Sequence, residues 1–223
     1  MTLKKEIYEQ IAQMAQQLAS PQRLEMLEYL AQAPRSVEEL AELAGLSVAN
    51  TSRHLQQLRR VGLVTVERAG RQRIYHLAGD DIVQAIRCLR RSAEKHLAEI
   101  SRILEHYWQE QGELPAIDFD TLRQIAKEDR VLLLDVRPPE EYARGHIPGA
   151  LNVPPDQIDT FLEHFDPKGK TVVAYCRGPY CTFSHKAVSA MRSKAIQALR
   201  LEEGLPEWRA EGGAIETFSQ PSA

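Results

Sequence analysis

The pattern of apolar residues changes near residue 111, so neither one helical bundle nor one sheet can account for the whole chain. Before that point, leucine, isoleucine and methionine recur every three or four residues, which is typical of amphipathic helices. After it, the continuous apolar runs VLLLDV (131–136) and TVVAYC (171–176), with a weaker third strand candidate over 195–204, alternate with helical stretches at about 119–128, 139–144, 156–164 and 182–193. Buried parallel strands have this composition. The pattern therefore predicts a multidomain fold, with a mostly α-helical first part and an α/β second part.

The domain boundaries follow from the same change. At 223 residues the chain has room for two small domains. Gly112 and Pro115 interrupt the pattern after a long helical stretch, as a linker does. We therefore expect a helical domain over residues 1–110, a linker over 111–117 and an α/β domain with a mainly parallel sheet over 118–223.

Composition argues against a membrane-spanning or secreted protein. No apolar run reaches the roughly 20 residues that a membrane span needs. The N-terminus, MTLKKEIYEQ, lacks the apolar core of a secretory signal, and three cysteines are too few for a disulfide framework. We expect a cytoplasmic protein with no membrane partner.

Capping residues mark two short helices between residues 36 and 62. Ser36 and Glu39 have the spacing of a capping box, and Gly45 ends the first helix. Ser47 caps the second helix and Gly62 ends it. Two short helices joined by a tight turn that contains glycine are typical of a helix-turn-helix.

The second of these helices is followed by a basic hairpin around Ala69 and Gly70. Although the net charge is −3, residues 47–77 hold six arginines and one acidic residue. We expect Leu55 and Leu58 on the buried face of the helix, with Val48 beside them, which leaves small, amide, hydroxyl and guanidinium groups to read base edges and contact phosphates. The predicted DNA-binding residues are Ser47, Ala49, Asn50, Thr51, Arg53, His54, Gln57, Arg68, Arg71 and Arg73.

The segment LSVANTSRHLQQLRRVGLVTVERAGRQRIYHL resembles the ArsR family of winged-helix repressors, over roughly residues 3–110. The resemblance implies a homodimer held by the first helix and by a long last helix over about residues 80–109. It also implies binding to palindromic double-stranded DNA.

The metal sites of that family are not matched. The segment SVEELAELAGL has no thiol where many relatives carry paired cysteines. His96 and His106 lack a full ligand set and are expected to face solvent or the dimer partner. Cys88 is single and is expected to be a packed apolar residue. No metal is predicted.

Two of the three cysteines, Cys176 and Cys181, bracket a turn between a predicted strand and a predicted helix. Ligands of parallel sheets bind at the carboxyl ends of strands, where Asp135, Cys176 and Glu202 are expected. Unpaired amides at the helix start would lower the pKa of the Cys176 thiol and stabilise its thiolate or persulfide. Cys181 would then attack the sulfur held at Cys176, giving a disulfide or a sulfur-bridged form. The remaining predicted residues of this persulfide loop are Arg177, Gly178, Pro179, Tyr180 and Thr182.

Two alternatives stay open for the loop. Arg177 either adds positive charge by pointing inward or is solvated. The two cysteines are otherwise buried structural thiols, although such thiols seldom occur as a pair in a Gly-Pro turn.

The segment LLLDVRPPEEYARGHIPGALNVP, together with the cysteine that opens the loop, resembles the rhodanese domain over residues 116–218. The resemblance implies a persulfide on Cys176, with Asp135 and Arg137 in the catalytic set as supports near the loop. His146 would be a framework residue.

The loop departs from the rhodanese pattern at its end. Many members that use thiosulfate place an arginine before a small hydroxyl residue, where this chain has Cys181 and Thr182. Loss of that cation argues against ordinary thiosulfate turnover. Related phosphatases need an arginine at the position of Thr182, so phosphate ester hydrolysis is not expected.

The combination resembles the ArsR–rhodanese fusion regulators. It predicts a repressor that senses reactive sulfur species through a persulfide, disulfide or polysulfide switch at Cys176 and Cys181. The expected partners are DNA, a second copy of the chain and a small sulfane-sulfur donor, with no cofactor.

One alternative is a thiosulfate or mercaptopyruvate sulfurtransferase with an accessory DNA-binding domain, and low-level sulfurtransferase activity at Cys176 fits either hypothesis. Another is a metal or arsenite sensor that uses the two thiols and His185.

Overall fold

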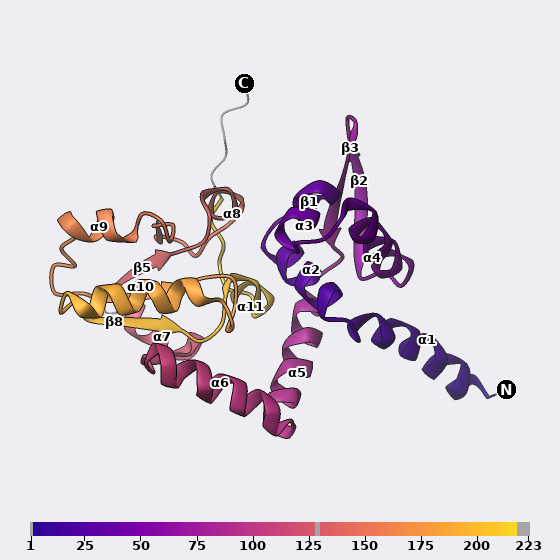
Figure 1. The fold of residues 1–223 in the computed structure, drawn as a ribbon, viewed down its shortest axis with the longest axis horizontal. Helices are drawn as coiled ribbons and strands as arrows, with labels where there is room; N and C mark the ends of the chain where they lie inside the picture. Colours follow the sequence, from indigo (N-terminus) through magenta and orange to yellow (C-terminus); the bar gives the residue numbers. More distant parts are fainter. Residues whose placement is uncertain (1, 128–129, 218–223) are drawn as a thin grey trace. The chain divides into compact units, whose positions relative to one another are not determined.

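The computed structural model describes residues 2–127 and 130–217 and forms two compact units, Met1–Val83 and Gln84–Ala223 (Figure 1). The chain passes from the first unit to the second inside helix α5 (Asp80–His96). This division assigns residues 84–110 to the second unit, whereas the predicted boundary lies between residues 110 and 118.

The first unit is a winged helix-turn-helix. A three-stranded antiparallel sheet of order β1-β3-β2 packs with four helices. The predicted capping box at Ser36 and Glu39 is present, and the Ser47 side chain accepts a hydrogen bond from the Asn50 amide. Both predicted helices and the predicted hairpin are therefore confirmed. The elements are α1 (Leu3–Leu18), α2 (Pro21–Gln32), β1 (Arg35–Ser36), α3 (Val37–Leu43), α4 (Val48–Arg60), β2 (Val64–Ala69) and β3 (Gln72–Leu77).

The buried face of α4 differs from the prediction at two positions. Leu55 and Leu58 are fully buried, as expected, but Val48 is 46% exposed. Thr51 is fully buried instead, so its prediction as an outward-facing residue is wrong. Residues 48, 51, 55 and 58 lie on one side of α4 because the helix repeats every 3.6 residues. Val48 is the first residue of the helix and is exposed at its end.

The second unit begins with two helices where one long helix was predicted. Helix α5 ends at His96, and α6 (Ala98–Gln111) follows Leu97, whose backbone is extended with φ −106° and ψ 99° (Figure 1). Cys88 is exposed on α5, so its prediction as a packed residue is wrong. His96 and His106 are exposed, as predicted.

Helix α5 is held to the C-terminal helix α11 (Leu205–Ala210) and its flanks by ion pairs. Arg90 contacts Glu203 at 2.6 Å and Glu207 at 3.0 Å. Arg87 pairs with Glu203 and, at 2.6 Å, with Glu211. These side chains are mostly buried, so removing one partner would leave the charge of the other buried and unpaired.

The rest of the second unit is a five-stranded parallel sheet of order β4-β8-β7-β5-β6, covered on both faces. The strands are β4 (Ala116–Ile117), β5 (Val131–Asp135), β6 (Leu151–Asn152), β7 (Thr171–Tyr175) and β8 (Ala198–Leu201). One core joins the sheet to α9 (Ile158–His164) and α10 (Thr182–Ser193), and the other joins it to α7 (Phe119–Ala126) and α11.

The predicted elements of this sheet are confirmed, and two edge strands were missed. The predicted helices over 139–144 and 182–193 match α8 (Pro139–Arg144) and α10, and residue 128 of the helix predicted over 119–128 lies outside the described residues. Strands β4 and β6 have two residues each, too few to form a recognisable apolar run. No described helix has the length and apolar character to span a membrane.

Replacing Glu203 with alanine is expected to destabilise the second unit by about 3 kcal/mol, because Arg87 and Arg90 lose a mostly buried carboxylate. Urea denaturation followed by tryptophan fluorescence measures this effect, since Trp108 and Trp208 both lie in that unit. Glu99→Ala is the control, because its pair with Arg102 is exposed and contributes about 0–1 kcal/mol. Equal effects of the two substitutions would contradict the expectation.

Candidate functional site

The predicted cysteine loop lies at the carboxyl end of the central strand β7 and leads into α10. Cys176 follows the strand directly, and Cys181 is the N-cap residue of the helix. The Cys181 amide donates a hydrogen bond to the Gly178 carbonyl at 3.2 Å, which closes a tight turn. Gly204 lies against this turn so closely that a Cβ atom there would collide with the Arg177 carbonyl. Sequence reasoning missed Gly204, although it follows a predicted strand.

Cys176 is the buried member of the thiol pair, with 2% of its surface exposed. Its thiol contacts the carbonyl oxygens of Gly178 at 3.8 Å and Cys181 at 3.6 Å, and the Ser184 hydroxyl at 3.6 Å. Burial raises the pKa of Cys176 well above its ordinary value. The hydroxyl and the amide of Ser184 act in the opposite direction, but they do not offset burial. The prediction that amides lower the pKa of Cys176 is therefore wrong.

Cys181 has the environment that was predicted for Cys176. A hydrogen bond from the Cys176 side chain, together with the amides of Phe183 and Arg177, lowers the pKa of Cys181 to about 7. The side chain is partly exposed. The amides at the start of α10 thus stabilise an anion on the second cysteine of the loop. The Cys176 sulfur lies 3.6 Å from the Cys181 carbonyl oxygen, so the two cysteines are neighbours in the loop, and bonding between their sulfur atoms stays a prediction.

Arg177 points toward a buried carboxylate. Its guanidinium makes a bidentate pair with Glu141, at 2.7 Å from Nη2 and 3.0 Å from Nε to Oε1. The Glu141 side chain is fully buried, and the Arg177 guanidinium lies 5.7 Å from the centre of the Phe183 ring. The charge of Arg177 therefore fixes the base of the loop and is already balanced.

The remaining loop residues contact α5, begin α10 and line a cavity beside α6. The Tyr180 hydroxyl donates a hydrogen bond to Glu94 on α5 at 2.5 Å. Thr182 is the first residue of α10. Pro179, Tyr180, Cys181 and Thr182 together form one wall of a cavity whose other wall is α6.

Asp135 and Arg137 form a fully buried pair at the end of the neighbouring strand. The Arg137 Nη2 atom lies 2.7 Å from Asp135 Oδ2 and also donates to the Gly145 carbonyl at 2.6 Å. Asn152 donates hydrogen bonds to the backbone carbonyls of both residues. His146 is buried as well, and its ring is stacked on that of Tyr142 with the two ring centres 3.8 Å apart. These contacts suit positioning residues that hold the sheet end in place.

The cavity between α6 and the cysteine loop has a volume of about 350 Å³. Its helix side is formed by apolar and aromatic side chains that include Ile100, Ile103, Leu104 and Trp108. Cys181 is part of the wall, and the lining, all within the described chain, contains no Asp, Glu, Lys, Arg or His side chain.

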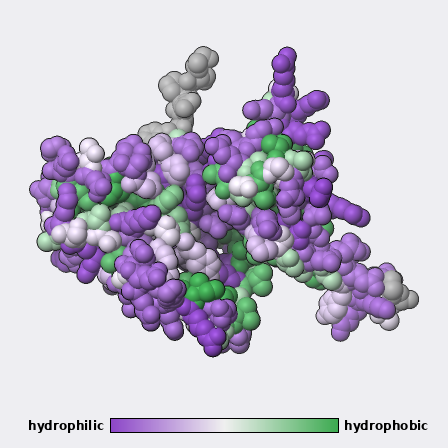
Figure 2. All heavy atoms as spheres, viewed as in Figure 1, coloured by the Kyte–Doolittle hydropathy of each residue, from purple (hydrophilic) through white to green (hydrophobic). Residues whose placement is uncertain are grey.

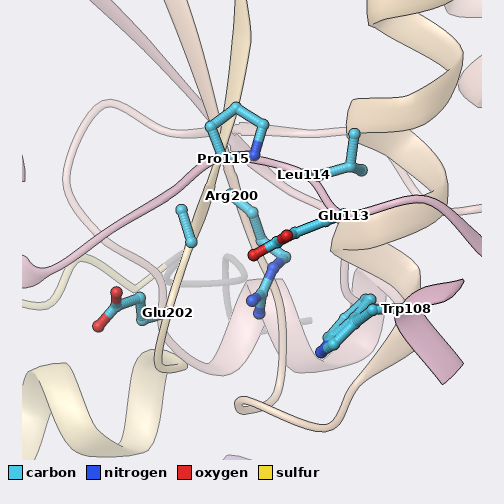
Figure 3. Close-up of a pocket in the computed structure, with 7 residues that line it drawn as sticks. Trp108, Glu113, Leu114, Pro115, Arg200 and Glu202 are labelled. Atoms are coloured by element: carbon cyan, nitrogen blue, oxygen red, sulfur yellow. The ribbon is translucent and has the colours of Figure 1, made fainter. Parts of the chain in front are cut away.

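A second cavity of about 690 Å³ shares Trp108 with the first (Figure 3). The Arg200 guanidinium lies in it, 5.4 Å from the centre of the Trp108 ring, and Glu113 and Glu202 line the same cavity. Burial lowers the pKa of Arg200. With two carboxylates and one guanidinium, this cavity has no net positive charge at neutral pH.

The predicted DNA-binding residues of the first unit, apart from Thr51, lie at least partly exposed on α4 and the hairpin. Ser47, Ala49, Arg53 and Gln57 are exposed, and Asn50 and His54 are half-buried. Arg68, Arg71 and Arg73 are all exposed on the β2–β3 hairpin, whose tip forms a hydrophilic projection (Figure 2). Arg23 on α2, which sequence reasoning missed, donates a hydrogen bond to Gln57 at 2.8 Å.

The thiols are not surrounded by metal ligands. Within residues 2–127 and 130–217, no group of three or more histidine, cysteine, aspartate or glutamate side chains could hold a metal ion. The His185 Nε2 atom lies 2.8 Å from the Gly112 carbonyl, and its ring lies 4.9 Å from that of Trp108. His185 therefore packs against the end of α6.

Comparisons with known proteins match both halves of the chain. The model of the rhodanese-like domain matches residues 118–211, and the model of bacterial regulatory proteins of the arsR family matches residues 20–66. The chain is 34% identical over 213 residues to the HTH-type transcriptional regulator Rv0324 of Mycobacterium tuberculosis, covering 96% of this chain and 93% of that protein.

Further relatives match one half each. A sulfurtransferase of Allochromatium vinosum is 35% identical over 98 residues, which are 43% of this chain and 89% of that protein. Among solved structures, the homodimeric winged helix-turn-helix DNA-binding domain of Mb0332 from Mycobacterium bovis aligns with a TM-score of 0.41 and 33% identity, covering 44% of this chain and 90% of that one.

The alkylation rate of Cys181 is expected to rise with pH around a midpoint of about 7, because its thiolate is the reactive form. Cys176→Ala removes the hydrogen-bond donor and should move the midpoint upward, toward the ordinary value of 9.0. Cys176→Ser keeps a donor and should leave it nearer 7. Iodoacetamide labelling followed by peptide mass spectrometry measures the profiles. Coincident midpoints for the alanine variant and the parent chain would contradict the expectation.

Proposed function

This chain belongs to the arsR family of bacterial regulatory proteins, carries a C-terminal rhodanese-like domain and is a transcriptional regulator, and we propose that it is a repressor that senses reactive sulfur species through Cys176 and Cys181. The observation that carries the proposal is the proximity of the two cysteines in one tight turn, where the Cys176 sulfur lies 3.6 Å from the Cys181 carbonyl oxygen and the two thiols shift each other's pKa in opposite directions. A sulfane sulfur bound to one thiol is then within reach of the other, and an internal disulfide or a sulfur bridge can form.

In this proposal, the DNA surface consists of α4 and the basic hairpin. The exposed amide and guanidinium groups of α4 suit base edges in a major groove, and the hairpin arginines suit phosphates. Winged helix-turn-helix proteins that bind palindromic operators do so as two-fold dimers.

A second copy of the chain would cover the apolar face of α1. Every described residue of this helix is at most partly buried, and Leu3, Ile7, Ile11 and Met14 are between 43% and 74% exposed. These residues follow the helical repeat and form one continuous stripe. A stripe of this kind favours helix-to-helix association.

The loop has a direct contact with α5 that would transmit its chemical state. Tyr180 holds Glu94, and Arg90 lies 3.8 Å from Glu94 and contacts Glu203 next to Gly204. The first turns of α5 carry Ile82 and Val83, which are buried. A sulfur bridge inserted between the cysteines would change the turn that presents Tyr180. A coupling of about 1–3 kcal/mol is enough for a usable switch.

Arg71→Ala is expected to weaken binding to all DNA sequences to a similar degree and to reduce the salt slope of binding by about 1, because one phosphate contact is lost. Fluorescence anisotropy over a series of salt concentrations measures this, with an operator selected from random DNA and an unrelated duplex. Arg102→Ala, an exposed change on α6, is the control. A loss confined to the selected operator would show that Arg71 reads bases.

Reduced and polysulfide-treated protein are expected to differ at least about fivefold in operator affinity, in either direction, because modification changes the loop. Cys176→Ser and Cys181→Ser should each abolish the difference, since a bridge needs both thiols. Cys88→Ser is the matched control and should respond like the parent chain. Anisotropy titrations measure the affinities.

Identical affinities of reduced and treated protein would refute sensing. Steady-state transfer of sulfur from thiosulfate or mercaptopyruvate, retained by Cys181→Ser, would favour the sulfurtransferase alternative instead. Stoichiometric loading that needs both thiols would favour the switch.

A further inference from the structure

Only one of the two thiols is accessible from the cavity between α6 and the cysteine loop. Cys181 forms part of the cavity wall, whereas Cys176 is 2% exposed and is not among the lining residues. A molecule held in the cavity would therefore meet Cys181 first. This order is the reverse of the one that the rhodanese resemblance implies.

The character of the cavity selects among sulfur donors. Its walls are mostly apolar and aromatic, and the described lining has no Lys, Arg or His side chain that could pair with an anion. Burying an unpaired anion in such surroundings is costly, since its hydration is not replaced. A volume of about 350 Å³ is at the small end for a ligand pocket and suits a compact molecule.

The nearby cations do not offer an anion a route to Cys181. Arg177 is already paired with Glu141. Arg200 lines the other cavity, together with Glu113 and Glu202, and the lining of that cavity does not include Cys181 (Figure 3). Thiosulfate, a dianion, would thus find no cationic side chain in the described lining of the cavity that includes Cys181.

We propose that the cavity between α6 and the cysteine loop admits an uncharged organic polysulfide, of the dialkyl trisulfide class, and that Cys181 is the thiol that attacks it first. The inference rests on the proposed function only in taking sulfane sulfur as the signal. It adds the class of donor, the entrance and the order of the two thiols.

The reaction balances without an external oxidant. The Cys181 thiolate attacks the central sulfur of R–S–S–S–R, one S–S bond breaks, and the departing R–S⁻ takes a proton from water. Cys176 then attacks the same central sulfur, the second R–S group leaves, and the Cys176 proton leaves with it as R–SH. The products are a sulfur bridge, Cys181–S–S–S–Cys176, and two molecules of thiol. Two cysteine sulfurs are oxidised and two R–S groups are reduced.

The first test follows loading of the reduced full-length chain by intact mass spectrometry, with dipropyl trisulfide or thiosulfate as the probe. Each rate is divided by the rate of the same probe with free glutathione. The normalised rate with the trisulfide is expected to exceed that with thiosulfate by at least about tenfold. The product should gain one sulfur atom and lose two hydrogen atoms. Cys181→Ser should not load, and Cys176→Ser should stop at a Cys181–S–S–S–R adduct.

The second test changes the cavity wall. Ile103 is 60% exposed on α6, so Ile103→Lys adds a cation at the cavity with little cost to folding. This variant should load more slowly with the trisulfide and faster with thiosulfate, changing the ratio by at least about tenfold. Leu151→Lys is the matched control, because Leu151 is a similarly exposed apolar residue on β6, outside the cavity. Its donor ratio should equal that of the parent chain.

Three results would overturn the inference. They are loading of Cys181→Ser at the parent rate, an unchanged donor ratio in Ile103→Lys, and a change of oligomeric state in Ile103→Lys by sedimentation with no change in loading. The last would mean that a second copy covers the cavity. If trisulfide-loaded protein binds its operator like the reduced protein, the sensing function is refuted and entry of the donor through the cavity is not. If operator binding responds to polysulfide without any donor preference, entry through the cavity is refuted and the sensing function is not.

Discussion

The close packing of Cys176 against Cys181 in one tight turn is the constraint on which the chemistry of this loop depends. It places a thiol whose pKa burial raises beside a thiol whose pKa is lowered. In the proposed switch, one group would attack and the other would resolve the product. A pair of equal thiols on a flexible loop would have neither the order nor the proximity. This difference in environment is what the proposed paired-thiol switch requires.

Three contacts hold the loop in place: close backbone packing, an ion pair and a hydrogen bond. Gly204, which follows β8, packs its backbone against the Arg177 carbonyl, where a Cβ atom would collide. The buried Glu141 fixes Arg177 through a bidentate pair. The hydroxyl of Tyr180 reaches Glu94 on α5. A loop fixed in this way transmits a change in its own length to the elements that hold it, since packed interiors yield little.

Local patterns predicted most elements of the fold, and the errors have physical causes. Capping residues located α3 and α4 because a cap is a contact between neighbours in the chain. The break at Leu97 was missed because nothing in the sequence there interrupts a helix, and the following segment packs in the second unit. Thr51 was placed outward because it is polar, yet the face of α4 is chosen by what packs against it.

Spacing and composition were enough to predict that two thiols bracket a turn at the junction of a buried strand and a helix, in a chain that also has a basic winged helix-turn-helix. The folded chain was needed to show which thiol is buried, which one has a lowered pKa, and that α6 forms an apolar cavity with the second cysteine. Burial and the direction of hydrogen bonds depend on segments far apart in the chain, and spacing alone carries no information about them.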